Sequence, residues 1–188
     1  MNILHKPTYF AHNQHRHYLR LLVFVALILI QSSATALQVE YVAMRNMDAF
    51  KKFNNLEQSA IVIKTRDSGI PYMEHLEFAS GELSNGEDHS TFFSVGPTWR
   101  FNKRIASSGL AFIEFGTSPT WISSDNFDNR ALGGNLYFTS NVQLGMHFGY
   151  RREVTLSLRV HHISNGGMSS KNPGADMVGL ELSYVFGK

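Results

Sequence analysis

The segment LYFTSNVQLGMHF, residues 136–148, decides the fold class because the character of its side chains changes at every second position. The odd positions are mostly polar or small, whereas the even positions are mostly apolar: Leu136, Phe138, Ser140, Val142, Leu144, Met146 and Phe148. Successive side chains of a β-strand point to opposite faces. The segment therefore predicts a strand with one apolar face and one polar face.

The same alternation recurs along the chain after residue 36. It predicts strands near residues 37–44, 58–65, 71–80, 91–101, 109–117, 136–149, 154–164 and 176–186. Pro97 weakens the prediction of continuous pairing in the fourth strand, and the apolar phase of the fifth is ambiguous. Eight antiparallel strands indicate an all-β fold, either a soluble lipid-binding barrel or a small outer-membrane barrel.

The predicted connections differ in length between the two ends of the barrel. Long ones follow alternate strands, at residues 45–57, 81–90, 118–135 and 165–175, and short ones follow the others, at residues 66–70, 102–108 and 150–153. Outer-membrane barrels have long loops on one side and short turns on the other. The polar phase carries residues suited to a polar lumen, namely Asn141, Gln143, His147, Arg159 and Glu181. We therefore expect an eight-stranded antiparallel transmembrane β-barrel.

The first 36 residues have the features of an export signal. A basic start precedes the apolar run LLVFVALILI, residues 21–30, and small residues at Ala34 and Ala36 form an A-x-A site. The run has ten residues, against about 20 for a membrane-spanning helix. The sequence predicts a cleaved signal peptide over residues 1–36 and an outer-membrane barrel domain over residues 37–188.

Charge and cysteine content exclude other classes of protein. The chain has 188 residues and no cysteine, so it forms no disulfide. Lys6, Arg16 and Arg20 are the basic residues of the first 36, which leaves 14 basic against 15 acidic side chains in the remainder. This near-neutral balance gives no support for a nucleic-acid partner.

Near the C-terminus, three polar side chains occupy strand positions that face the same side as the apolar residues. His162 and Ser164 alternate with the leucines and valines of the seventh strand, and Asp176 does so in the eighth, whereas His161 takes the polar face. A nucleophile, a base and an orienting acid form the site of a serine hydrolase. The H-x-S pattern alone is weak, but polar groups facing lipid are costly, which favours a function for them.

The segment HISNGGMSSKNPGADMVGLELSYVF, residues 162–186, resembles the signature of the PagL-type lipid A deacylases. The resemblance is carried by an H-x-S-N element, an N-P-G element and an acidic residue fourteen positions after the histidine: His162, Ser164, Asn165, Asn172, Pro173, Gly174 and Asp176. It extends over most of residues 90–188. It implies an outer-membrane barrel enzyme that hydrolyses the ester-linked acyl chain at the 3 position of lipid A.

The resemblance also implies roles for the three polar residues. Ser164 would be the nucleophile, His162 the general base, and Asp176 the residue that orients the imidazole. The family commonly has glutamate in the third place, so the shorter Asp176 side chain is expected to need a small backbone adjustment. Aspartate fills this role in many unrelated hydrolases, and we expect activity to survive.

The loop residues have supporting roles by the same resemblance. Asn165, with the backbone N–H groups of Gly166 and Gly167, would hold the oxyanion, and Asn172 would support the acidic residue. No metal or cofactor is implied. The expected partners are lipopolysaccharide as substrate and the lipid of a Gram-negative outer membrane, with a homodimer left open. The alternatives are a non-catalytic outer-membrane barrel, used for adhesion or structure, and a soluble lipid carrier.

Overall fold

The computed structural model describes residues 37–46, 55–65, 74–105, 109–127, 130–172 and 174–186. The predicted signal peptide lies outside these residues. The described elements are all strands: β1 (Leu37–Asn46), β2 (Glu57–Thr65), β3 (His75–Ser84), β4 (His89–Arg104), β5 (Leu110–Ile122), β6 (Asn126–Phe127), β7 (Arg130–Ala131), β8 (Leu136–Phe148), β9 (Val154–Ser164) and β10 (Ala175–Phe186). In this part of the chain no helix is long and apolar enough to cross a membrane.

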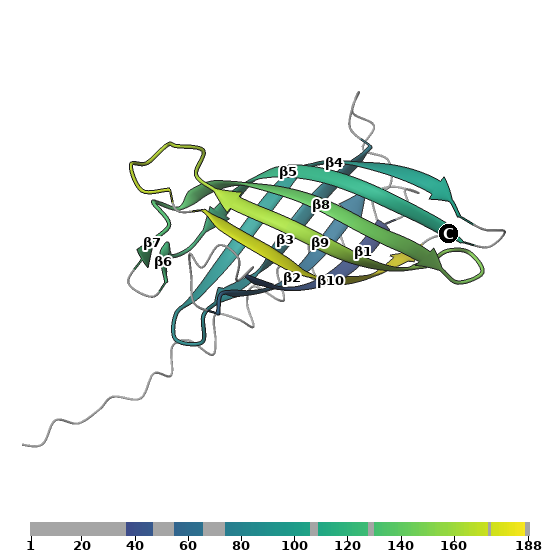
Figure 1. Ribbon diagram of the computed structural model, residues 1–188, viewed down its shortest axis with the longest axis horizontal. Helices are drawn as coiled ribbons and strands as arrows, with labels where there is room; N and C mark the ends of the chain where they lie inside the picture. The colour runs from purple at the N-terminus through teal and green to yellow at the C-terminus, as the bar shows by residue number, and fades with distance from the viewer. Residues whose placement is uncertain are drawn as a thin grey trace, which may run out of the picture. The chain divides into compact units, whose positions relative to one another are not determined.

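Eight of the strands close into an antiparallel barrel in the order β1-β10-β9-β8-β5-β4-β3-β2 (Figure 1). Closure is complete because β1 pairs with both β10 and β2, which leaves no strand edge unpaired. The short strands β6 and β7 form a separate hairpin in the connection between β5 and β8. The predicted fold class is confirmed.

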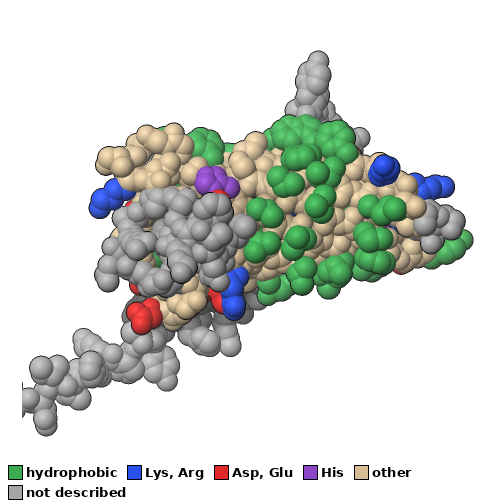
Figure 2. Space-filling view, viewed as in Figure 1, with side chains coloured by type: hydrophobic (Ala, Val, Ile, Leu, Met, Phe, Trp, Pro, Cys, Tyr) green, Lys and Arg blue, Asp and Glu red, His purple; other side chains and the backbone are tan. Residues whose placement is uncertain are grey.

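On the barrel strands, the side chains that face outwards are mostly the apolar ones. On β8 the even positions face out, as predicted, and Leu144 is 55% exposed while its neighbour Gln143 is fully buried. The phase of β5, ambiguous in the sequence, has Phe115 outside and Glu114 inside. In the view of Figure 2, hydrophobic side chains spread over the barrel wall and charged ones lie towards its two ends.

The third strand and its loop differ from the prediction. β3 runs over residues 75–84 rather than 71–80, so the expected long connection at residues 81–90 is a turn of only residues 85–88. Asn85 closes this turn because its Oδ1 accepts hydrogen bonds from the N–H groups of Glu87, at 3.1 Å, and Asp88, at 2.7 Å. Such a turn needs no more residues. The same shift lengthens the connection before β3, predicted to be short at residues 66–70, to residues 66–74, so the contrast between long and short connections holds only at the other loops.

Two prolines interrupt one ladder of the barrel without ending its strands. β4 continues through Pro97, and β5 continues through Pro119. Between these described strands, residues 95–97 have no ladder partners in residues 117–119, although the register is the same on either side. Proline has no N–H to donate, which explains the local loss of pairing.

The interior of the barrel has two zones. Near the long-loop end the inward side chains form an apolar plug, which consists of Val42, Met44, Leu56, Ala60, Val62, Ala79, Leu83, Phe92, Ile122, Phe127, Leu132, Tyr137, Ile163, Ala175 and Met177. The remaining inward positions are mostly polar or charged, and they include the predicted lumen residues Asn141, Gln143, Arg159 and Glu181. The buried Lys, Arg and Glu side chains of the lumen therefore lie below the plug, whereas the uncharged Gln58 lies at its level, opposite Met44 and Leu83.

A buried charge network fills the polar zone around Lys64. The Nζ atom of Lys64 lies 2.6 Å from Glu114, 2.9 Å from Glu40 and 3.2 Å from Glu77. All four side chains are at most 4% exposed. One cation from β2 thus holds carboxylates from β1, β3 and β5 across the lumen.

Two arginines extend this network to the other strands. Arg159 on β9 pairs with Glu181 at 2.8 Å and with Glu77 at 3.0 Å. Arg100 on β4 pairs with Glu114 at 2.7 Å, and Gln143 on β8 donates a hydrogen bond to Glu181. Every strand of the barrel therefore contributes a side chain to one connected network.

Replacing Lys64 by methionine should destabilise the barrel strongly. The change leaves several carboxylates buried without their shared cation, and breaking a buried pair costs about 3–5 kcal/mol. The measurement is the free energy of unfolding by urea in detergent or lipid.

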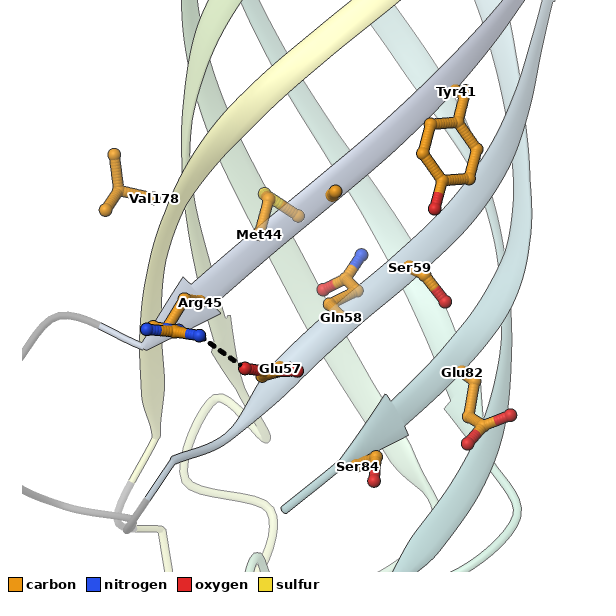
Figure 3. A pocket seen from close by; sticks show the side chains of 10 residues that line it. Tyr41, Met44, Arg45, Glu57, Gln58, Ser59, Glu82, Ser84 and Val178 are labelled. Carbon is orange, nitrogen blue, oxygen red and sulfur yellow. Dashed lines mark hydrogen bonds and ion pairs between the residues drawn. The ribbon is translucent and has the colours of Figure 1, made fainter. Parts of the chain in front are cut away.

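The matched control is Arg45→Met, which breaks an ion pair with Glu57 on the outer wall, 72% and 55% exposed (Figure 3). An exposed pair contributes at most about 1 kcal/mol. Equal losses of stability in the two variants would contradict a structural role for the network.

Candidate active site

His162 and Asp176 are direct cross-strand partners on the outer wall. β9 and β10 pair in regular register through His162 and Asp176. The Nδ1 atom of His162 lies 2.6 Å from Oδ1 of Asp176, and the two side chains are 45% and 22% exposed. Since facing side chains of such a pair start about 5 Å apart, the short aspartate reaches the ring without a break in the ladder. The expected backbone adjustment is therefore not needed.

Ser164 lies on the same face of β9, two residues closer to the loop. It is half-buried, and its cross-strand partner on β8 is Phe138. Residues two apart on a strand are separated by about 6.5–7 Å at Cα. Among the described residues the Ser164 hydroxyl makes no hydrogen bond, so no ring nitrogen of His162 lies at hydrogen-bond distance from it in this structure.

The two adjacent histidines separate as predicted. His161 is buried in the lumen at 5% exposure, and neither of its ring nitrogens has a hydrogen-bond partner among the described residues. The inward neighbours of the site, Ile163, Ala175 and Met177, belong to the apolar plug. The inward side chains directly behind the site are therefore apolar except for His161.

Asn165, the residue after Ser164, anchors the loop of residues 165–174. Its side chain is fully buried, and its Nδ2 donates to the carbonyl oxygens of Lys171, at 2.7 Å, and Gly133, at 3.2 Å. Its Oδ1 accepts the N–H of Gly167 at 3.0 Å. The amide of Asn165 is thus committed to holding the loop.

Asn172 and the glycines complete the arrangement of the loop. The Asn165 N–H donates to Oδ1 of Asn172 at 3.0 Å. Gly166 and Gly167 have positive φ angles of 62° and 81°, which glycine adopts readily. Within the described chain the Gly166 N–H has no acceptor, and a Cβ at Gly166 would lie 3.3 Å from the Phe138 ring. Pro173 of the N-P-G element lies outside the described residues.

The sequence did not indicate the contact between this loop and the one before β8. Gly133 has a φ of 102°, and a Cβ there would collide with the Lys171 carbonyl and lie 2.6 Å from Nδ2 of Asn165. Oδ2 of Asp125 accepts the N–H groups of Gly133, at 3.3 Å, and Gly134, at 2.8 Å. The only sequence signal was the Gly-Gly pair, which indicates a turn but not its partner.

A shallow groove of about 440 Å³ lies beside the site on the outer wall of β1, β2 and β3 (Figure 3). It approaches the site at Arg45, whose partner on β10 is Val178. The charged residues that line it are Arg45, Glu57 and Glu82, so carboxylates outnumber cations and the groove does not select anions. No cluster of three possible metal ligands occurs among the described residues.

Comparison with known proteins identifies relatives of this arrangement. The family model described as lipid A 3-O-deacylase (PagL) matches residues 62–185. The lipid A deacylase PagL of Bordetella bronchiseptica is 35% identical over 75 residues, which are 40% of this chain and 41% of the relative. The match thus spans about two fifths of the curated relative.

Solved structures share the barrel at low sequence identity. The crystal structure of the outer membrane enzyme PagL aligns with a TM-score of 0.59 and 16% identity, covering 79% of this chain and 98% of that one. Neisserial surface protein A aligns with a TM-score of 0.53 and 11% identity, covering 81% and 97%. These two structures support the fold, and the match of the family model over residues 62–185 shows that the chain belongs to the lipid A 3-O-deacylase (PagL) family.

Proposed function

We propose that this protein is an outer-membrane esterase that removes the acyl chain from the 3 position of lipid A, with Ser164, His162 and Asp176 as its catalytic residues. The observation that carries the proposal is the 2.6 Å contact between His162 and Asp176 on the lipid-facing wall, with Ser164 two residues away. Family membership supports the reaction class. With the N-terminus on the periplasmic side, the site lies in the leaflet that holds lipopolysaccharide.

The reaction has two steps. Oγ of Ser164 attacks the ester carbonyl carbon while Nε2 of His162 takes the hydroxyl proton. The bond to the sugar oxygen breaks, that oxygen receives the proton from His162, and the acyl chain stays on Ser164. Water then attacks the carbonyl carbon of the acyl-enzyme while His162 takes its proton. The bond to Oγ of Ser164 breaks, Oγ receives that proton from His162, and the fatty acid leaves. Asp176 accepts the hydrogen bond from Nδ1 throughout and stabilises the imidazolium.

Gly166 is the best placed donor for the oxyanion. The Asn165 N–H and side chain and the Gly167 N–H have partners within the loop, whereas the Gly166 N–H is free among the described residues. Gly166 also lies against Phe138, the partner of Ser164. We therefore assign the oxyanion to the Gly166 N–H, and assign Asn165 and Asn172 to holding the loop in place.

A non-catalytic surface barrel is the alternative, and the fold shared with Neisserial surface protein A is compatible with it. It gives no reason for a histidine and an aspartate to contact each other among outward side chains of β9 and β10 that are mostly apolar. Release of fatty acid from lipid A by the purified protein separates the two proposals.

Replacing Ser164 by alanine should reduce acyl release by at least about a thousandfold, because the nucleophile is lost. The measurement is mass spectrometry of lipid A after incubation with the purified variant. Ser170→Ala, at an exposed serine of the same loop, is the matched control and should keep its activity. Release by Ser164→Ala at the control rate would exclude the proposed nucleophile.

The two substitutions of Asp176 should have opposite outcomes. Asp176→Asn keeps the size of the side chain but stabilises the wrong imidazole tautomer, so we expect kcat to fall by about 10³- to 10⁴-fold. Asp176→Glu keeps the carboxylate and should keep most of the activity. Equal activity of both variants would show that the carboxylate does not act on His162.

Asn165→Ala should lower kcat at least about tenfold without unfolding the barrel. The change removes the hydrogen bonds to Lys171, Gly133 and Gly167, so the loop no longer fixes the Gly166 N–H. The barrel strands keep their pairing, which is measured as the shift in gel mobility between unheated and boiled samples. A variant with normal kcat would refute the anchoring role.

A further inference from the structure

A second groove of about 440 Å³ lies on the outer wall of β5, β8 and β9, beside the β4–β5 and β8–β9 turns. The outward side chains that line this turn-end groove are apolar, and they include Ile105, Ala111, Leu144, Met146, Phe148 and Leu156. The wall is low at Ala111 because its single methyl group lies in one row between the long side chains of Lys103 and Met146.

Lys103 is a cation in an apolar part of the outer wall. Its neighbours on the same face of β4, Phe101 and Ile105, are 61% and 60% exposed. Lys103 is exposed and has no ion-pair partner among the described residues. It pairs with Ala111 in the ladder, so it stands at the edge of the turn-end groove. A lysine on a lipid-facing wall extends its ammonium towards the headgroups, and here the strand ends one residue later.

Further basic side chains lie at the same end of the barrel. Arg104 ends β4, and Arg151 and Arg152 lie in the turn between β8 and β9. The two connections are neighbours because β5 pairs with β8 (Figure 1). In the view of Figure 2, the charged side chains at this end are basic. Together with Lys103, they place four cations beside the turn-end groove.

Among the described residues, two carboxylates also lie at this end. Oε2 of Glu153 accepts the N–H of Arg151 at 2.9 Å, and Oε2 of Glu74 accepts the N–H of Arg100 at 2.6 Å. Glu74 precedes β3, which β4 separates from the strands of the groove. Cations therefore outnumber carboxylates at the edge of the groove, and an anionic ligand suits this charge.

The turn-end groove lies far along the wall from the proposed catalytic residues. Met146, which lines it, is six residues along β8 from Ser140, the ladder partner of His162. Six residues of a strand span about 20 Å. A lipid with its headgroup beside Lys103 therefore belongs to the leaflet opposite the one at the catalytic residues. In an outer membrane, that periplasmic leaflet consists of glycerophospholipids.

We propose that the turn-end groove binds one anionic glycerophospholipid of the periplasmic leaflet. The phosphate lies beside Lys103 and Arg104, and one acyl chain runs along the groove past Ala111 towards Leu144. The cationic edge matches the headgroup and the apolar lining matches the chain. The inference goes beyond the proposed function, because it uses none of the catalytic residues.

The test is native mass spectrometry of the protein released from nonionic micelles that contain equal amounts of dioleoyl phosphatidylglycerol and dioleoyl phosphatidylcholine. Wild-type protein should retain phosphatidylglycerol at least about fivefold over phosphatidylcholine, the effect of a cation close to an anionic headgroup. Lys103→Gln should lower this ratio at least about threefold. Lys103→Arg, which keeps the charge, should retain the preference.

Arg45→Gln is the matched control for charge, because it removes an exposed cation of the outer wall at the other end of the barrel. It should keep the wild-type ratio. A wild-type ratio of one, an unchanged ratio in Lys103→Gln, or an equal loss in Arg45→Gln would overturn the inference.

A second variant tests the apolar part of the site. Ala111→Phe fills the groove and should reduce the amount of either phospholipid that is retained. Leu182→Phe, in the same row of the wall but outside the groove, should keep it. Each variant is first shown to fold by the shift in gel mobility on boiling, and Ala111→Leu replaces Ala111→Phe if that variant does not fold.

Two further outcomes would overturn the inference. Full retention of phospholipid by the folded Ala111 variant would mean that the groove holds no lipid. A protein dimer that retains no phospholipid and that the Ala111 variant dissociates would place a second copy of the chain in the groove. Since the readout is lipid binding, a failure to release acyl chains would refute the proposed function and leave this inference standing.

Discussion

The buried charge network of the lumen is the constraint on which the rest of the structure depends. Lys64 holds Glu40, Glu77 and Glu114 at 2.6–3.2 Å in a space from which lipid is excluded. A slip of one residue in any strand would turn these charges into the membrane. The network therefore sets the phase of the strands, and with it the side of the wall on which each side chain lies. Buried ion pairs often contribute little net stability, so we assign to these pairs the role of fixing which face of each strand points inwards.

The site follows from this phase. Because Arg159 is fixed in the lumen by Glu77 and Glu181, positions 162 and 164 of the same strand must face outwards. Between them, Ile163 points inwards and joins the apolar plug. Inward and outward side chains thus alternate along β9. Arg159 is an inward residue that belongs to the charge network, whereas Ile163, the inward residue nearest the loop, belongs to the apolar plug.

The sequence predicted the fold and the three outward polar residues because both depend on a period of two. Alternation assigns a face to each residue without knowledge of its partners, and it separated His161 from His162. Alternation carries less information about where a strand ends, so β3 was placed four residues too early and its turn at Asn85 was missed. It carries none about contacts between distant loops. The three carbonyl groups that bind Asn165 come from residues 132, 133 and 171, and no local pattern connects them.

Regular strand pairing is enough to bring the short Asp176 side chain to the ring of His162. An acid directly opposite a histidine on a paired strand begins about 5 Å away from it. At Asp176 the ladder continues unbroken to Ala175, and the carboxylate makes a 2.6 Å contact from that position. In the proposed mechanism the strand pair therefore orients His162, and the loop needs to place only the surroundings of Ser164. Asn165 follows the last residue of β9, so strand pairing no longer fixes the chain at this point. The side-chain hydrogen bonds of Asn165 hold the loop there instead.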